Sequence, residues 1–198
     1  MDYTNAIITY IRLEQDILSK LETNAINDVL NALENARMKN ASIYIFGNGG
    51  SASTASHFTN DFNKGISEHL KQPYKFVCLN DSIATIMAIA NDISYDAIFE
   101  FQLRGKVTKD DVAIGISGSG NSLNVINAIK LAKSVGSMTI GLTGFDGGKL
   151  KDIVDLSMHV PVMSMQVTED IHMVFDHLMM SVLYESICGI NHLRRTEA

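Results

Sequence analysis

Residues 112–122 read Val-Ala-Ile-Gly-Ile-Ser-Gly-Ser-Gly-Asn-Ser, an apolar, β-branched run that passes directly into a loop of serine and glycine. A short run of this composition predicts a buried strand, and the apolar spacing after the loop predicts a helix. The same unit occurs earlier, where Ser-Ile-Tyr-Ile-Phe at 42–46 precedes Gly-Asn-Gly-Gly-Ser at 47–51. This repeated order of strand, glycine loop and helix predicts a parallel α/β sheet.

Both loops are expected at the carboxyl ends of their strands, where an open α/β sheet places its ligands. Glycine lets the backbone approach an anion closely, and serine hydroxyls add hydrogen-bond donors. The free N–H groups at the start of the following helix supply a positive potential. The loops therefore predict a small phosphate ligand, and no nucleotide cofactor is expected.

The rest of the chain continues the α/β pattern. Five apolar runs predict strands, at 42–46, 75–79, 112–116, 138–142 and 156–160, and the stretches between them predict helices, at 51–64, 82–103 and 122–135. Helical spacing also predicts two helices within residues 4–39 and one long C-terminal helix from Thr168 to about Leu193. The predicted fold is a three-layer αβα sandwich with a five-stranded parallel sheet, Rossmann-like or flavodoxin-like.

Composition excludes several classes of protein. The chain has 198 residues, 46% of them apolar and 19% charged, which predicts one domain. A net charge of −6, with a single basic cluster at Arg194 and Arg195, argues against nucleic acid as a partner. Without a basic-then-apolar leader or a long uncharged span, a cytoplasmic protein with no membrane partner is expected.

Within this domain we expect N-terminal helices over 1–40, a parallel α/β core over 41–165 and a C-terminal helix over 166–198. The N-terminal helix pair and the C-terminal helix are apolar on more surface than a monomer needs to cover its sheet. The sequence therefore predicts a homo-oligomer with the N-terminal helices at its interface.

Titratable residues gather in two helices. His57 and Asp61 are four residues apart and so project from one face of the helix after the first loop. The C-terminal helix carries a dense group in an otherwise apolar segment: Glu169, Asp170, His172, Asp176 and His177.

Glu169 and His177 are eight residues apart, about 80° around the helix axis, so both can reach one pocket. With His57 and Asp61 they form a two-histidine, two-carboxylate set that could bind a divalent metal or divide acid and base roles. Ordinary structural pairing of each histidine is the alternative.

These segments, taken in order, resemble the phosphoheptose isomerases of the sugar isomerase (SIS) superfamily. The resemblance covers nearly the whole chain. It rests on Phe46-Gly47-Asn48-Gly49-Gly50-Ser51, His57-Phe58, Asn91-Asp92, Ile116 through Ser122, Leu142-Thr143-Gly144, Asp146-Gly147-Gly148, and Ile171-His172 through His177.

The resemblance implies a single SIS domain over residues 1–198 that isomerises sedoheptulose 7-phosphate to glycero-manno-heptose 7-phosphate, a ketose-to-aldose step in bacterial surface heptose biosynthesis for lipopolysaccharide or capsule. It also implies a homotetramer with active sites between subunits, and zinc or another divalent metal.

Matching positions carry the implied roles. The implied catalytic residues are Asp61, His177 and Glu169. The implied metal ligands are His57, Asp61, Glu169 and His177. The implied substrate-binding residues are Asn48, Gly49, Gly50, Ser51, Asn91, Asp92, Ser117, Gly118, Ser119, Ser122 and Glu169.

Two positions depart from the family pattern: Asp61 stands where glutamate is usual, and Glu169 where glutamine is usual. A shorter side chain displaces the carboxylate by on the order of 1 Å, which can cost ~100-fold in a proton transfer. Glu169 could then act as the base, or both changes could strengthen metal binding. An isomerase of a different phosphosugar, or a non-catalytic SIS module that binds sugar phosphates or a protein, is the alternative function.

Overall fold

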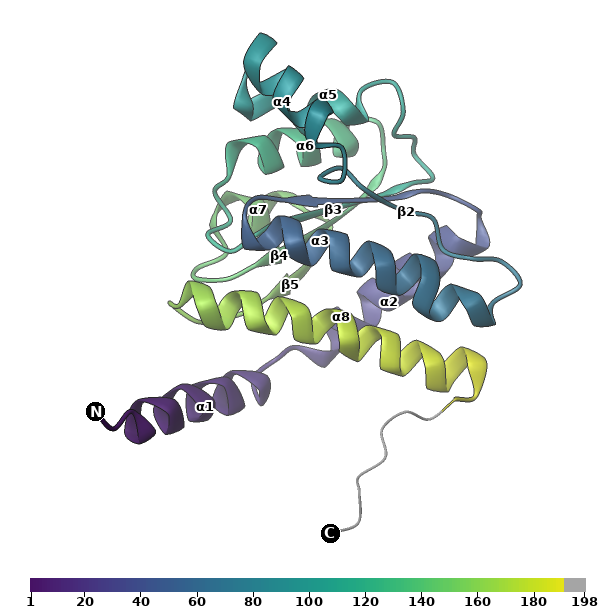
Figure 1. Ribbon diagram of the computed structural model, residues 1–198. Helices are drawn as coiled ribbons and strands as arrows, with labels where there is room; N and C mark the ends of the chain where they lie inside the picture. Colours follow the sequence, from purple (N-terminus) through teal and green to yellow (C-terminus); the bar gives the residue numbers. More distant parts are fainter. Residues whose placement is uncertain (191–198) are drawn as a thin grey trace.

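A five-stranded sheet forms the centre of the computed structural model, which describes residues 1–190 (Figure 1). All strand pairs are parallel, in the order β2-β1-β3-β4-β5. The strands are β1 (Ile43–Gly47), β2 (Phe76–Cys78), β3 (Val112–Ser117), β4 (Met138–Thr143) and β5 (Leu156–His159). The predicted three-layer α/β fold with a five-stranded parallel sheet is confirmed.

Helices cover both faces of the sheet. Eight α-helices lie within the described residues: α1 (Thr4–Leu18), α2 (Thr23–Met38), α3 (Gly50–Asn60), α4 (Ile83–Asp92), α5 (Glu100–Leu103), α6 (Leu123–Ser134), α7 (Gly148–Ile153) and α8 (Met165–Cys188). One apolar core joins the sheet to α2, α3 and α8, and a second joins it to α4, α5, α6 and α7.

Alternate residues of the central strands supply the two cores. In β1, Ile43 and Ile45 belong to the core under α3 and α8, whereas Tyr44 and Phe46 belong to the opposite core. All residues of β1 and β3 are buried. Burial on both faces explains why these strands read as continuous apolar runs rather than alternating ones.

Two predicted helices differ from the structure. The segment 82–103 is divided into α4, a 3₁₀ turn η3 (Tyr95–Ala97) and α5, because the backbone becomes extended at Ser94. The segment 51–64 is α-helical only to Asn60 and continues as a π-helix, η1 (Asp61–Gly65), then a 3₁₀ helix, η2 (Ile66–His69). No proline or glycine stands at Ser94 or at the start of the π-helix, whereas Gly65 ends the π-helix.

The predicted long C-terminal helix is confirmed, but it begins and ends at other residues than predicted. Ser164 caps it, with its side chain accepting a hydrogen bond from the Val167 N–H, and the helix begins at Met165 rather than Thr168. It ends at Cys188 because Gly189 takes a left-handed φ of +67°, which glycine adopts without strain. The last predicted helical residues, 191–193, lie outside the described residues.

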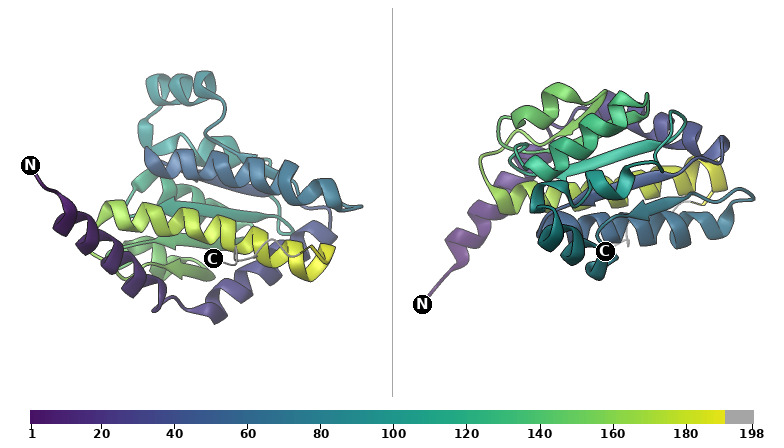
Figure 2. Two further views of the ribbon diagram at one scale, coloured as in Figure 1. Left: turned by 60° about the horizontal axis from the view of Figure 1, so that its bottom comes forward. Right: turned by 90° about the horizontal axis from the view of Figure 1, so that it is seen from above.

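The arrangement of strands and helices fixes where a ligand can bind. The sheet order reverses between β1 and β3, and the two glycine loops follow these neighbouring strands. In such sheets the crevice at this reversal is the usual ligand site. Helices α3 and α8 run side by side in the same direction from this edge (Figures 1 and 2).

Helix α1 extends away from the sheet and contacts α8 (Figure 2). In the described part of the chain, no helix combines the length and apolar character needed to span a bilayer.

Candidate active site

The two glycine loops form a cleft of about 270 Å³. Nine of the residues predicted to bind substrate line it: Asn48, Gly49, Gly50, Ser51, Ser117, Gly118, Ser119, Ser122 and Glu169. Ser51 is in the first turn of α3, and Ser122 precedes α6 as its N-cap residue. The cleft thus combines serine hydroxyls with two helix N-termini, an arrangement suited to phosphate.

The second loop contains a glycine at a position where a side chain would displace the neighbouring turn. Gly120 has φ of +66°, and a Cβ there would overlap the carbonyl oxygen of Gly147. The Ser117 hydroxyl donates a hydrogen bond of 3.1 Å to the Ser122 hydroxyl. The close packing of the Gly120 and Gly147 turns therefore fixes the positions of these hydroxyls.

An amide pair positions Asn48 at the edge of the cleft. Its Nδ2 donates to Oδ1 of Asn124 at 2.9 Å, and Nδ2 of Asn124 donates back to Oδ1 of Asn48 at 3.0 Å. The hydroxyl of Tyr95 also donates to Oδ1 of Asn48, at 2.9 Å. Asn124 is 1% exposed, so the pair fixes the Asn48 amide from inside the protein.

Glu169 reaches the cleft from α8. A Cβ on Gly50 would lie 2.5 Å from Oε2 of Glu169, so the carboxylate packs directly on the first residue of α3. The positive potential of the α3 N-terminus favours a negative group at this point. Glycine at position 50 is required for this approach.

Asn91 and Asp92, the remaining predicted substrate residues, end α4 outside the lining of this cleft. Both are exposed, and Nδ2 of Asn91 donates to Oδ1 of Asp92 at 2.8 Å. Tyr95, in the turn that follows α4, contacts the cleft residue Asn48.

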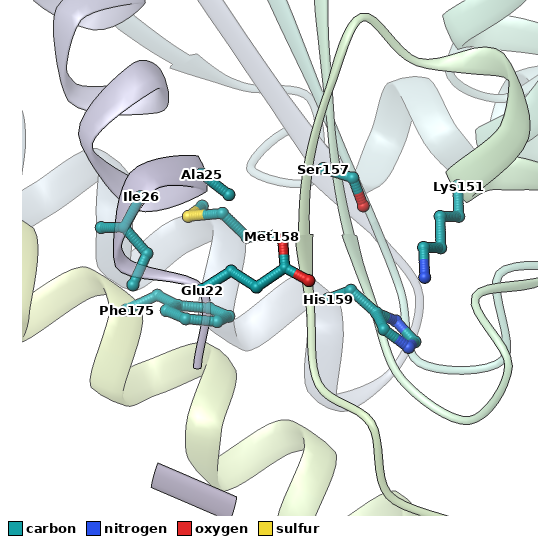
Figure 3. Close-up of a pocket in the computed structure, with 8 residues that line it drawn as sticks. All are labelled: Glu22, Ala25, Ile26, Lys151, Ser157, Met158, His159 and Phe175. Atoms are coloured by element: carbon teal, nitrogen blue, oxygen red, sulfur yellow. The ribbon is translucent and has the colours of Figure 1, made fainter. Parts of the chain in front are cut away.

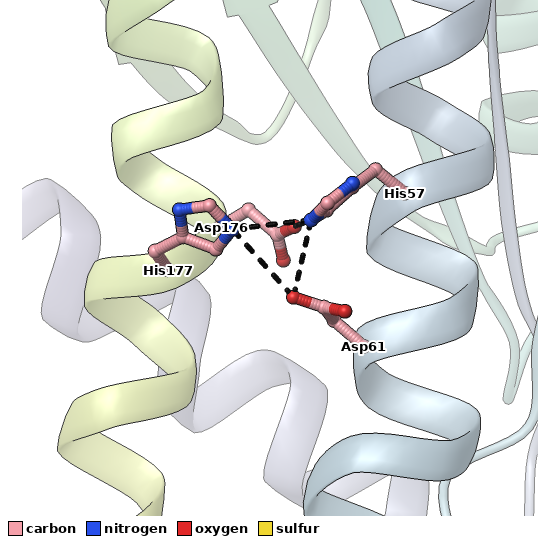
Figure 4. Close-up of side chains that lie close together, drawn as sticks. All are labelled: His57, Asp61, Asp176 and His177. Carbon is pink, nitrogen blue, oxygen red and sulfur yellow. Dashed lines mark hydrogen bonds and ion pairs between the residues drawn. The ribbon is translucent and has the colours of Figure 1, made fainter. Parts of the chain in front are cut away.

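A second cluster, which we call the His–Asp cluster, consists of His57, Asp61, Asp176 and His177 (Figure 4). Its histidine Nε2 atoms are 3.1 Å apart. Oδ2 of Asp61 lies 3.3 Å from the His57 nitrogen and 3.8 Å from that of His177. One ligand atom from each residue lies within 4.8 Å of all the others.

Asp176 is the buried member of the His–Asp cluster. Its Oδ2 lies 3.8 Å from Nε2 of His57, and its side chain is 0% exposed. Burial, and secondly the charge of Asp61, raise the pKa of Asp176 to about 8. Neither of its oxygens has a hydrogen-bond partner among residues 1–190.

The donor set fits a divalent cation. Two imidazole nitrogens and two carboxylates are typical ligands of zinc, and ligands at ~2 Å from a tetrahedral metal are ~3.3 Å apart. The unpartnered carboxylate of Asp176 also requires a positive neighbour or a proton.

The predicted metal set is assembled only in part within the chain. His57, Asp61 and His177 lie together, whereas Glu169 lines the cleft at the glycine loops. Eight residues of α8 separate Glu169 from His177, or about 12 Å along the axis at ~1.5 Å per residue. The fourth member of the cluster is Asp176.

Sequence reasoning did not place Asp176 in the cluster, or Asn124 and Tyr95 beside Asn48. Asp176 carried a signal, since an acidic residue interrupts the apolar pattern beside His177. Asn124 and Tyr95 carried none, because only the packing of α6 and η3 against the first loop brings them to Asn48.

A separate, smaller cavity of about 80 Å³ lies between α2 and β5 (Figure 3). Glu22, Lys151 and His159 are its charged or titratable lining residues. None of the predicted site residues lines this cavity.

Comparison with known proteins agrees with this geometry. The SIS domain family model matches residues 9–144. A phosphoheptose isomerase of Aliarcobacter butzleri is 38% identical over 141 residues, which cover 71% of this chain and 74% of that protein. A phosphoheptose isomerase of Aquifex aeolicus is 32% identical over 169 residues, which cover 85% of this chain and 88% of that protein.

Among solved structures, phosphoheptose isomerase from Neisseria gonorrhoeae is similar with a TM-score of 0.84 and 27% identity. The match covers 92% of this chain and 98% of the Neisseria chain. The chain belongs to the phosphoheptose isomerase family of SIS-domain proteins.

Proposed function

We propose that the protein interconverts sedoheptulose 7-phosphate and glycero-manno-heptose 7-phosphate, as a cytoplasmic step toward bacterial surface heptoses. The observation that carries the proposal is the presence of two chemically different sites along one helix pair. A phosphate-type cleft lies at the start of α3 and α8, and the His–Asp cluster lies further along both helices.

The separation of these sites supports a long substrate. His57 follows Gly50 by seven residues of α3, or about 10 Å at ~1.5 Å per residue. In sedoheptulose 7-phosphate the reacting carbons, C1 and C2, are at the opposite end of the chain from the phosphate on C7. A phosphate in the cleft would leave C1 and C2 directed along the helix pair toward the cluster.

In this proposal the glycine loops anchor the substrate. Ser51, Ser117, Ser119 and Ser122 donate to the phosphate with the backbone of 49, 50 and 118, and Asn48, Asn91 and Asp92 contact sugar hydroxyls. Binding energy from the distant phosphate then serves to orient the reacting carbons.

Isomerisation requires a base at the carbon next to the carbonyl and an acid at oxygen. We assign the base to Asp61 and proton transfer at oxygen to His177, because these groups face each other in the cluster. Glu169 is the other candidate base, and its place in the phosphate cleft favours a role in substrate binding instead.

A divalent metal such as zinc, held by His57, Asp61 and His177, would supply Lewis-acid polarisation of the substrate carbonyl in place of a proton on the cluster nitrogen of His177. His57 orients the Asp61 carboxylate through its 3.3 Å contact.

We further propose a homotetramer with its active sites between subunits, formed by the SIS domain over residues 1–198. Exposed apolar side chains on α1 support this: Ile7, Ile8, Ile11, Leu13 and Leu18. A groove of about 320 Å³ lies beside the cluster and is lined by Met180 among others. It is open and mainly apolar, and so also offers a surface for a neighbouring subunit.

The test is incubation of the purified protein with sedoheptulose 7-phosphate in D₂O, followed by NMR with and without chelator. Aldose phosphate and solvent deuterium at the reacting carbons are expected. Asp61→Asn should abolish deuterium incorporation, whereas Glu169→Gln should retain it. Phosphosugar binding without turnover would instead favour another phosphosugar substrate or a non-catalytic binding module.

A further inference from the structure

Asp176 is a buried carboxylate whose one polar contact among the described residues is the 3.8 Å approach of its Oδ2 to Nε2 of His57. Its side chain is 0% exposed, and neither oxygen accepts a hydrogen bond from residues 1–190. An isolated buried carboxylate costs several kcal/mol. The sequence around it is apolar, so nothing in the core of α8 explains an acidic residue at this position.

The side chain of Asp176 points toward His57 and Asp61 of the His–Asp cluster (Figure 4). Adjacent residues of a helix point about 100° apart, so Asp176 and His177 reach the cluster from different sides. Asp176 approaches from the interior, and the His177 side chain, 60% exposed, approaches from the solvent side. Both side chains meet His57 and Asp61 between α3 and α8.

Glu169 is unsuited to complete the same set. It precedes Asp176 by seven residues, or about 10 Å along α8 at ~1.5 Å per residue. Its carboxylate packs on Gly50 at the start of α3, whereas His57 and Asp61 lie further along α3 and at its end.

We propose that Asp176 is the fourth ligand of a divalent-cation site formed with His57, Asp61 and His177 of the same chain, and that Glu169 is not a ligand. The inference rests on the metal-assisted form of the proposed function. Two carboxylates balance the charge of a divalent cation, so the filled site is neutral where it enters the interior. Asp176 would hold the cation from the buried side of the cluster, since its side chain is 0% exposed.

Titration of the metal-free protein with Zn²⁺ alone, by calorimetry in the absence of sugar, tests the assignment. Wild type should bind one Zn²⁺ per chain. Asp176→Asn, which keeps the shape of the side chain, should weaken Zn²⁺ binding at least tenfold. Glu169→Gln is the matched control on the same helix, and its affinity should stay within twofold of wild type.

A measurement on the wild-type protein covers the case in which Asp176→Asn does not fold. With ¹³C-labelled carboxyl groups, Zn²⁺ should shift two aspartate signals and no glutamate signal. Undiminished Zn²⁺ affinity in folded Asp176→Asn, or a shifted glutamate signal with one aspartate, would overturn the inference. Because sugar is absent, a failure here is distinct from a failure of isomerisation.

Discussion

The Nε2 atoms of His57, in α3, and His177, in α8, lie 3.1 Å apart. Two neutral imidazoles can make this contact only if one nitrogen donates a proton to the other, and two protonated ones would repel each other. The pair is therefore a place where a proton or a cation is held between two helices.

Replacement of His177 should remove catalysis and leave the phosphate cleft intact. His177→Asn is expected to lower kcat for sedoheptulose 7-phosphate by about 10²–10⁴, the usual contribution of a positioned acid–base group. His69→Asn, a partly exposed histidine beyond the π-helix, is the control and should keep kcat. Inorganic phosphate should bind both variants as it binds wild type; equal kcat in the two variants would contradict the role of His177.

Removal of Asn124 should reduce substrate affinity through Asn48. Asn124→Ala leaves the Asn48 amide without its buried partner, which is expected to raise KM about tenfold and to lower the free energy of unfolding by about 1–3 kcal/mol. Asn127→Ala, on the same helix, removes only a 3.3 Å bond to the Asp96 carbonyl and is the matched control. An unchanged KM in Asn124→Ala would show that the pair is structural.

Alanine at Gly105 and at Gly120 should distinguish the cost of backbone strain from the cost of steric overlap between an added Cβ and the Gly147 turn. Gly105 and Gly120 both have positive φ, at +72° and +66°, but a Cβ has open space only at Gly105. Gly105→Ala should lower the free energy of unfolding by about 1 kcal/mol. Gly120→Ala should lower it by about 3 kcal/mol, because the Gly147 turn must move, and should also weaken phosphate binding. Denaturant unfolding and phosphate titration of both variants measure this difference.

Much of the fold follows from the sequence alone. Strands such as 42–46 and 112–116 are buried on both faces, so their apolar runs are unambiguous, and the glycine loops after them identify the cleft. The interrupted helix over 82–103 does not follow, since its break at Ser94 has no glycine or proline. At this break Tyr95 donates a hydrogen bond to Asn48 in the first loop, a tertiary contact that local sequence does not indicate.

The sequence identified most of the candidate site residues, but not which of them lie together in the structure. Helical spacing gives the angle between Glu169 and His177 around the helix axis. The prediction that both reach one pocket used this angle and not their distance along the axis. The structure separates them along the axis and brings Asp176 to the cluster instead. Helical angles set adjacent residues apart, so only the packing of α8 against α3 shows that Asp176 and His177 converge.

His172 should make the folded protein sensitive to acid. Its ring is fully buried, Nε2 lies 3.4 Å from the Thr143 carbonyl oxygen, and Nδ1 has no hydrogen-bond partner in the range 1–190. Burial is the main cause that lowers the pKa of His172 to about 4, and His159 nearby lowers it further. In the unfolded chain a histidine titrates near ~6.5.

Below that pH the unfolded state binds a proton that the folded state rejects, so the free energy of unfolding falls as pH decreases from about 6.5 to 4. Above pH 7 both states are neutral and this effect is absent. At about 1.4 kcal/mol per pKa unit, the loss approaches 3 kcal/mol. Urea unfolding of wild type and His172→Leu at pH 7.5 and 4.5 measures it. The variant should lose about 2–3 kcal/mol less than wild type over this interval, whatever its stability at neutral pH, and equal losses would assign the acid sensitivity to other groups.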